Sequence, residues 1–183
     1  MRKLLNEELP RLSKEEFKQQ EKKPIVIVLD NVRSHLNVGS IFRTADAFLI
    51  QGMYLCGITG LPPHRDIHKT ALGATETVEW KYFKSAVEAI QYLKELNYII
   101  VSIEQTERAT RLNEFIPRKE EKYAIVFGNE VDGVTQDVID LSDLAVEIPQ
   151  YGMKHSLNVA VSAGITMWDV SVKMSMHNIF VEL

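Results

Sequence analysis

Three polar segments of the chain combine glycine with side chains that can bind ligands or take part in catalysis. In chain order, their residues of interest are Asn37, Ser40 and Arg43, then Gly128 and Glu130, and then Ser156 and Asn158. Glycine permits tight turns and close approach of the backbone to a ligand, whereas a fixed guanidinium can stabilise a developing negative charge. Each segment alone also fits an ordinary helix cap or solvated turn, so a functional interpretation requires all three together.

Several other kinds of active site lack their motifs in this sequence. A phosphate-binding loop requires Gly-Lys-Ser/Thr and a dinucleotide site requires Gly-x-Gly-x-x-Gly, and neither is present. His64 and His68 have the spacing of metal ligands on a helix, but two prolines precede them and no HExxH motif or cysteine accompanies them. We therefore predict a surface loop there and no metal. His155 and Ser156 are neighbours in sequence, which rarely gives the geometry of a base and its nucleophile.

Each polar segment follows a short apolar run, which indicates its place in the fold. Such runs are typical of strands buried on both faces of a parallel sheet, and we expect strands at Ile25–Leu29, Met53–Cys56, Tyr98–Ile103, Tyr123–Phe127 and Leu144–Ile148. Helical patterns lie between several of them, at Val38–Phe48, Ser85–Leu96, Gln136–Leu141 and Leu157–Met174. The alternation predicts an α/β fold with a mostly parallel sheet and helices on both faces. Ligands bind such sheets at the carboxyl ends of the strands.

Local sequence also predicts how the helices begin. Asn37 is expected to cap the helix that follows it, so that Asn37, Ser40 and Arg43 approach one rim of the site. Ser156 and Asn158 stand at the entrance of the last helix, where these residue types ordinarily cap.

Residues 1–23 are predicted to form a helical arm and residues 24–183 a single domain. The arm is expected to be one amphipathic helix over Leu4–Lys23, with Ser13 and Glu16 as a capping box. Its apolar face would comprise Leu9, Leu12 and Phe17.

Composition limits the setting in which the protein works. With 183 residues, 45% hydrophobic and 25% charged, the chain has the make-up of one soluble globular domain. Cys56 is the only cysteine, and no signal-peptide core or long apolar span is present, so we expect a cytoplasmic protein that does not contact membranes. The net charge of −4 disfavours nucleic acid through the overall field, so any RNA affinity must come from local cationic patches.

Taken together and in this order, the three segments resemble the signature motifs of the SpoU (TrmH) family of RNA 2′-O-ribose methyltransferases, part of the SPOUT superfamily. The resemblance covers most of residues 24–175, and the order, the spacing and the strand expected before each motif all agree. It rests on Asn37-x-Gly39-x-x-x-Arg43-Thr44-Ala45-Asp46, Phe127-Gly128-Asn129-Glu130, Ile148-Pro149-Gln150 and Ser156-Leu157-Asn158-Val159.

The resemblance implies a SPOUT fold with a C-terminal trefoil knot, whose loops bind S-adenosyl-L-methionine and release S-adenosyl-L-homocysteine. It also implies a homodimer, in which the first motif of one subunit faces the cofactor of the other. The small residues that follow Asn158 suit a close contact between subunits. The positions that would surround the cofactor are Ile103, Gly128, Ile148, Ser156 and Leu157.

The same resemblance gives Arg43 the central catalytic role, with two interpretations left open. Arg43 either accepts the proton of the ribose 2′-hydroxyl with help from a substrate phosphate, or stabilises the developing alkoxide. Asn37, Glu130, Ser156 and Asn158 match positions that orient Arg43, the substrate ribose and the methionine end of the cofactor.

The expected substrate is tRNA, because Val101–Thr106 and Val146–Gln150 look most like enzymes that methylate the D-loop guanosine at position 18. Ribosomal RNA and other tRNA nucleotides are the alternatives. A catalytically inactive RNA-binding module of the same fold and a nucleotide-binding protein without methyl transfer are further ones. The side chains expected to contact RNA are Arg33, Arg43 and Lys154, with wider support from Arg2, Lys3, Arg11, Lys14, Lys22, Lys23, Arg65 and Lys69.

Overall fold

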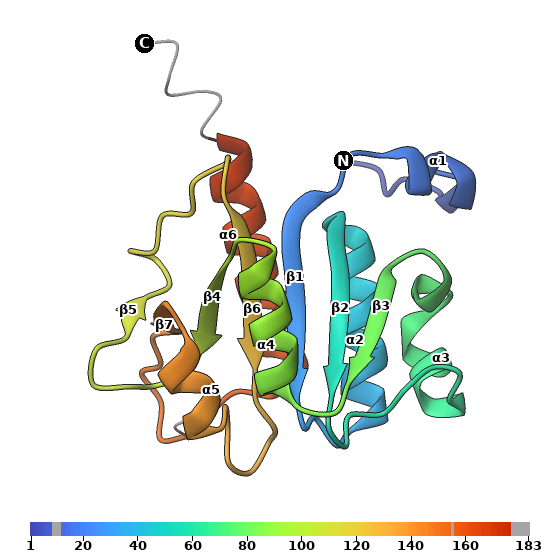
Figure 1. Ribbon diagram of the computed structural model, residues 1–183. Helices are drawn as coiled ribbons and strands as arrows, with labels where there is room; N and C mark the ends of the chain where they lie inside the picture. Colours follow the sequence, from blue (N-terminus) through green and yellow to red (C-terminus); the bar gives the residue numbers. More distant parts are fainter. Residues whose placement is uncertain (9–11, 155, 177–183) are drawn as a thin grey trace.

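A computed structural model of the protein describes residues 1–8, 12–154 and 156–176. Its centre is a seven-stranded sheet in which every pairing is parallel, with the strand order β3-β2-β1-β6-β4-β7-β5. The strands are β1 (Lys23–Asp30), β2 (Ile50–Cys56), β3 (Glu79–Phe83), β4 (Tyr98–Ile103), β5 (Thr110–Arg111), β6 (Lys122–Phe127) and β7 (Leu144–Glu147). All strands therefore direct their carboxyl ends to the same edge of the molecule (Figure 1).

Helices cover both faces of the sheet, as the alternating pattern predicts. Figure 1 shows α4 (Ala86–Glu95) and α5 (Gln136–Leu141) in front of the sheet, with α2 (His35–Ala47) and α6 (Val159–Met176) behind it. The shorter α3 (Arg65–Ala71) packs against α2 on that rear face, followed by the 3-10 helix η2 (Ala74–Glu76). No helix in the described part of the chain is long and apolar enough to cross a membrane.

The two layers of the core explain why β1 is a continuous apolar run. Ile25, Ile27 and Leu29 point to the rear layer with α2 and α6, whereas Val26 and Val28 point to the front layer with α4. All five side chains are at most 2% exposed. Full burial of an aliphatic side chain contributes roughly 1.5–3 kcal/mol, so this strand anchors both layers and fixes the loop that follows Asp30.

The predicted strands and long helices are confirmed, but four elements of the described domain were not predicted. These are the helix α3, the 3-10 helix η2 and the edge strands β3 and β5. The expectation of a surface loop around His64 and His68 is wrong, because His64 caps α3 by accepting a hydrogen bond from the backbone N–H of Asp66 at 3.2 Å. An imidazole cap is uncommon compared with Ser, Thr, Asp or Asn, so the sequence carried no strong start signal.

The N-terminal arm is not the single helix expected over Leu4–Lys23. It contains the 3-10 helix η1 (Asn6–Glu8) and the α-helix α1 (Lys14–Gln19), and β1 already begins at Lys23. The capping box of Ser13 and Glu16 is confirmed, and Phe17 is buried, but Leu12 is 50% exposed and Leu9 lies outside the described residues.

Candidate active site

One cavity lies at the carboxyl ends of β4, β6 and β7 and has a volume of about 280 Å³. This is near the lower end of the roughly 300–1,000 Å³ typical of small-molecule sites. The five positions expected to surround a cofactor come from four separate segments, and the structure brings all of them to its wall: Ile103, Gly128, Ile148, Ser156 and Leu157.

The loop after β6 forms one wall of this cavity and depends on Gly128. A Cβ atom on Gly128 would lie 1.8 Å from the carbonyl carbon of Gly133, far inside van der Waals contact. The loop closes there because Asn129 and Gly133 exchange two backbone hydrogen bonds, of 3.2 and 3.1 Å. The side-chain oxygen of Asn129 also accepts from the backbone N–H groups of Val131 and Asp132, each at 2.9 Å. Gly128 is therefore needed to build the wall, whatever ligand the cavity holds.

Glu104 is a site residue that the sequence reasoning missed. It follows directly after β4 and lines the cavity. Its carboxylate accepts a 3.0 Å hydrogen bond from the backbone N–H of Val134, which ties the loop after β6 to the end of β4. The available signal was its position after a buried strand, the same criterion that selected the other loops.

The cavity is acidic, which determines the kind of ligand it favours. Four carboxylate side chains line it, and its described wall holds no lysine, arginine or histidine. A wall of one charge sign attracts ligands of the opposite sign, so the cavity suits a cation better than a phosphate. The four residues are Glu104, Glu130, Asp132 and Glu147. Within the described residues, no three His, Cys, Asp or Glu side chains gather so that they could hold a metal ion.

Asn37 joins the three polar segments by hydrogen bonds. Its side-chain amide donates to the carboxylate of Glu130 at 2.9 Å, and its carbonyl oxygen accepts from the side-chain amide of Asn158 at 3.2 Å. The three residues come from α2, from the loop after β6 and from the start of α6, and are 121 positions apart at the extremes. One asparagine therefore holds one residue from each motif at the rim of a single cavity.

The expectation that Asn37 caps α2 is wrong. The helix begins at His35, and Ser34 is its cap, accepting a hydrogen bond from the backbone N–H of Asn37. Because the helix starts earlier, Asn37 lies in its first turn, and its side chain bonds to Glu130 instead of capping the helix. Ser40 instead donates to the carbonyl of Leu36 at 2.9 Å.

Arg43 lies apart from the cavity of its own chain. It is exposed on α2 and is not among the residues that line the cavity. The buried positions of this helix, such as Val38 and Phe42, face the sheet, so the exposed Arg43 points away from it. Within a single chain, Asn37 contacts Glu130 and Asn158, whereas Ser40 bonds within its own helix and Arg43 is exposed on that helix, so a shared rim for the three stays a prediction.

Asn158 has a second role as the cap of α6. Its side-chain oxygen accepts from the backbone N–H groups of Ala160 at 2.9 Å and Val161 at 3.4 Å. The amide group of the same side chain meets Asn37, so the start of the helix and the rim of the cavity are fixed together. Arg33 and Lys154, expected to contact RNA, are both exposed in loops beside these motifs. His155 lies outside the described residues.

Gly39 of the first motif serves helix packing. A Cβ atom there would lie 2.1 Å from the hydroxyl of Thr70 and 2.3 Å from the carbonyl oxygen of Ile67, both on α3. Only glycine lets α2 and α3 approach this closely, which fixes α2 and with it the positions of Asn37 and Arg43.

The comparisons with known proteins agree with this geometry. The sequence profile of the SpoU rRNA Methylase family matches residues 24–168. This chain belongs to that family. The match covers β1 through most of α6, and so it includes every residue that lines the cavity.

Curated relatives of this SpoU family member act on two kinds of RNA. The tRNA (guanosine(18)-2′-O)-methyltransferase of Thermus thermophilus is 29% identical over 155 residues, which is 85% of this chain and 78% of the relative. The 23S rRNA (guanosine-2′-O-)-methyltransferase RlmB of Neisseria meningitidis is 28% identical over 144 residues, which is 79% of this chain but 56% of the relative. The chain thus spans little more than half of the ribosomal enzyme.

Solved structures of the family have the same fold. The AdoMet-bound rRNA methyltransferase of Sinorhizobium meliloti superposes with a TM-score of 0.76 at 22% identity, covering 84% of this chain and 59% of that one. The TrmH/SpoU tRNA modifying enzyme of Aquifex aeolicus superposes with a TM-score of 0.78 at 23% identity, covering 90% of this chain and 82% of that one.

Proposed function

We propose that this SpoU family member is an S-adenosylmethionine-dependent RNA 2′-O-ribose methyltransferase that works as a homodimer on cytoplasmic tRNA. The observation that carries the proposal is the hydrogen-bonded chain Glu130–Asn37–Asn158, which joins the three motifs at one cavity. Methyl transfer to a hydroxyl requires the two reactants to be held in line, and a rim fixed from three directions suits that task.

The cavity fits the cofactor in both shape and charge. The close turn at Gly128 lines the cavity together with Ile103 at the end of β4 and Ile148 just after β7. Its four carboxylates favour the positive charge of a sulfonium. When bound, S-adenosylmethionine supplies an electrophilic methyl group. In this proposal Ser156 and Leu157 enclose it from the start of α6, and Glu130 faces the ribose of the substrate.

Arg43 acts on the cavity of the partner subunit in this proposal, because it lies outside the cavity of its own chain. A guanidinium stays protonated in proteins, so we assign it the stabilisation of the alkoxide that develops on the ribose oxygen. The proton then leaves to water or to a substrate phosphate held beside the same guanidinium.

The surface of α6 supports a homodimer. A stripe of apolar side chains spaced three or four residues apart is exposed on this helix, and such spacing places them on one face. Gly164, where an added Cβ would meet nothing within 4 Å, is likewise not required for packing inside the chain. The stripe consists of Val161, Ile165 and Trp168, which are 39–56% exposed.

Subunits with complementary defects test the shared site. Arg43→Ala removes the arginine and leaves the cavity, whereas Ser162→Phe fills the cavity from α6 and leaves the arginine. Each homodimer should be inactive, but an equal mixture after subunit exchange should regain about a quarter of the parental activity, because half of the dimers then carry one complete site. Sedimentation confirms that the variants still dimerise. If the mixture stays inactive although mixed dimers form, the shared site is refuted.

We also assign residues 24–183 to a domain with a C-terminal trefoil knot, preceded by the arm at residues 1–23. The ammonium group of Lys173 on α6 donates to the carbonyl oxygens of Leu112 at 2.6 Å and Phe115 at 2.9 Å. The last helix is thus bound to the long connection between β4 and β6.

Guanosine 18 in the tRNA D-loop is the substrate we propose first. The chain covers 78% of the Thermus tRNA enzyme but only 56% of the Neisseria rRNA enzyme. Mass spectrometry of tRNA and rRNA nucleosides from a deletion strain tests this choice: loss of 2′-O-methylguanosine from tRNA supports it. Loss of a ribosomal mark would transfer the activity to rRNA. Unchanged RNA in the deletion strain, together with a purified protein that does not bind the cofactor, would favour an inactive RNA-binding module.

A further inference from the structure

A second cavity lies at the β3 end of the sheet, bordered by α3, η2 and β3, whereas the candidate active site lies at β4, β6 and β7. Its volume is about 480 Å³, larger than the first. Pro62, Pro63, Ile67 and Trp80 supply its apolar walls. We call it the α3 cavity. Nothing in the roles assigned above uses it.

The walls of the α3 cavity offer a stacking surface. Trp80 lies on the edge strand β3 and is half-buried, packed in part against the rear core and in part facing the cavity. Prolines at the facing wall add flat, rigid apolar surface. Aromatic faces of this kind bind nucleobases of single-stranded RNA, because every base can stack on them.

Basic side chains gather around the same cavity although the chain as a whole is acidic. Arg65 and His68 line it from α3, and both are exposed. Lys14 of α1 reaches across from the arm and donates a hydrogen bond to the carboxylate of Glu76, which also lines the cavity. The hydrogen bond from Lys14 holds the pKa of Glu76 below its usual value, and the charges of His68 and Lys18 add to that effect. Among the described residues that line this cavity, Glu76 is the one acid, and it is paired with Lys14.

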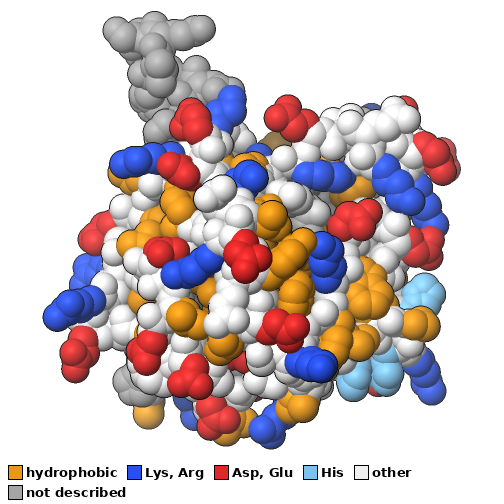
Figure 2. Space-filling view, viewed as in Figure 1, with side chains coloured by type: hydrophobic (Ala, Val, Ile, Leu, Met, Phe, Trp, Pro, Cys, Tyr) orange, Lys and Arg blue, Asp and Glu red, His pale blue; other side chains and the backbone are white. Residues whose placement is uncertain are grey.

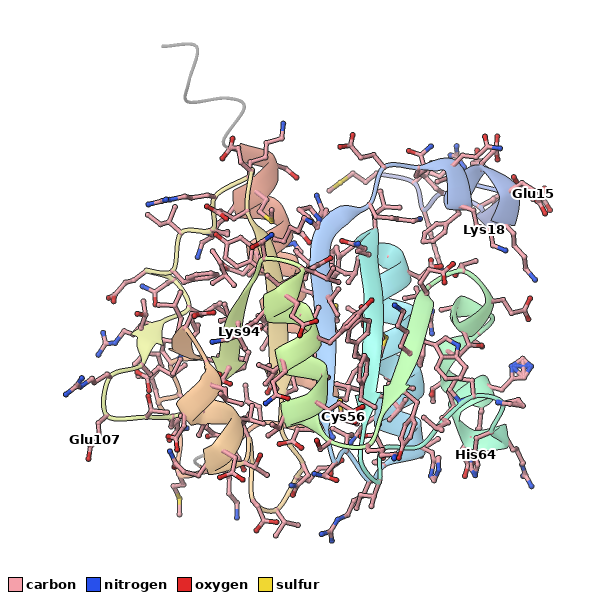
Figure 3. All side chains as sticks on the ribbon, viewed as in Figure 1. Glu15, Lys18, Cys56, His64, Lys94 and Glu107 are labelled. Atoms are coloured by element: carbon pink, nitrogen blue, oxygen red, sulfur yellow. The ribbon has the colours of Figure 1, made fainter. Side chains whose placement is uncertain are left out.

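Figure 2 shows histidine side chains next to apolar ones at this edge of the molecule, and Figure 3 shows His64 at the start of α3, with Lys18 on α1 above it. Apolar walls and an open cationic rim together suit a ligand with a flat ring and a phosphate. Because Arg65 is exposed at the rim, an RNA whose nucleotide occupies the cavity can extend from there over the protein surface.

The α3 cavity is connected directly to the helix that carries Arg43. The ring of His64, which lines the cavity, stacks on His35 at the start of α2 with 3.8 Å between the ring centroids. Thr70 of α3 donates a 3.0 Å hydrogen bond to the carbonyl oxygen of Leu36 on α2. A ligand in the cavity is thus held at a fixed position relative to the catalytic arginine, one helix away from it.

We propose that the α3 cavity binds a nucleotide of the substrate RNA other than the one that is methylated, with its base stacked on Trp80 and its phosphate at Arg65. This inference rests on the proposed function. The active-site cavity is acidic and does not attract phosphate, so the α3 cavity supplies part of the RNA binding. Lys14 of the N-terminal arm lies beside the same α3 cavity, where it bonds to Glu76.

The test uses the full-length protein and an unmodified tRNA transcript. Arg65→Ala should weaken tRNA binding by about three- to ten-fold and reduce the slope of log Kd against log salt by about one, because one phosphate contact is lost. In the methylation assay it should raise KM for tRNA and leave kcat unchanged. Arg111→Ala is the matched control, since Arg111 is an exposed arginine on β5 at the other end of the sheet; its binding and salt slope should equal those of the parent.

Stacking on Trp80 is measured separately by fluorescence. The chain has two tryptophans, so tRNA-induced quenching in the parent that disappears in Trp80→Phe places the base on Trp80. Phenylalanine retains an aromatic wall and so keeps the fold, which thermal melting checks.

The outcomes separate this inference from the proposed function. If the parent methylates tRNA but Arg65→Ala and Trp80→Phe bind tRNA as the parent does, with the same salt slope and the same quenching, the α3 cavity is not an RNA site and the proposed function stands. If quenching occurs with free guanosine monophosphate and not with tRNA, the cavity binds a small nucleotide and the inference is again overturned. If the parent neither binds S-adenosylmethionine nor methylates any RNA, the proposed function itself fails.

Discussion

Replacing Asn37 with alanine should disconnect the three motifs from one another. The change removes a 2.9 Å hydrogen bond to the Glu130 carboxylate and a 3.2 Å hydrogen bond from Asn158. An intramolecular hydrogen bond contributes about 1.5–3 kcal/mol to the free energy of unfolding when one partner is charged, and about 0.5–1.5 kcal/mol when both are neutral. Because Glu130 and Asn158 are exposed, water replaces part of each contact. We therefore expect a loss of roughly 1–2 kcal/mol in the free energy of unfolding.

For a domain of this size, such a loss lowers Tm by roughly 2–8 °C. A double-mutant cycle isolates the contact: Asn37→Ala and Asn158→Ala should couple by about 0.5–1 kcal/mol, measured by urea unfolding. Ser40→Ala is the control, because its hydroxyl contacts only the Leu36 carbonyl of the same helix. Additive effects of the two asparagine changes, or an equal loss in Ser40→Ala, would refute the idea that Asn37 connects the motifs.

Three further predictions follow from individual contacts. Arg43→Ala should leave the affinity for S-adenosylmethionine nearly intact in calorimetry while abolishing methylation; parental turnover would show that Arg43 is not catalytic. Gly39→Ala should cost about 1–3 kcal/mol of stability, since its Cβ would overlap Ile67 and Thr70, and a melting curve equal to the parent's would contradict this. Cys56 is fully buried, and burial, followed by the charges of Asp30 and Glu88, raises the pKa of its thiol. It should therefore resist a thiol reagent at pH 8 until urea unfolds the chain, and stability should decline as the pH rises above roughly 8.5, the thiol's unfolded value; rapid labelling of the native protein would contradict that burial.

The parallel sheet was predictable because its strands are buried on both faces. Runs such as Ile25–Leu29 are continuous for that reason, and their order along the chain placed every polar loop at one edge of the sheet. The edge strands were missed because they lack this signal: β3 is partly exposed along its length and β5 has only two residues.

The sequence predicted which residues belong to the site better than it predicted the hydrogen bonds between them. The resemblance to the SpoU family named five positions around a cofactor, and all five lie on the cavity wall. The bond between Asn37 and Asn158 could not be foreseen, because it joins residues 121 positions apart and depends on α2 beginning at His35. Gly39 belongs to a motif that the sequence analysis singled out. Its structural role, the close approach of α3, could not be predicted because α3 itself, which His64 caps, was not predicted.

The most direct test of the central claim is transfer of a labelled methyl group. The parent protein is incubated with deuterated-methyl S-adenosylmethionine and unmodified tRNA, and the nucleosides are analysed by mass spectrometry beside a reaction with the folded cavity variant Ser162→Phe. We predict that the label appears on the ribose 2′-oxygen of one guanosine with the parent and is absent with the variant. Label on a base, no label with a protein that binds the cofactor, or equal transfer by the variant would contradict the assignment of the cavity.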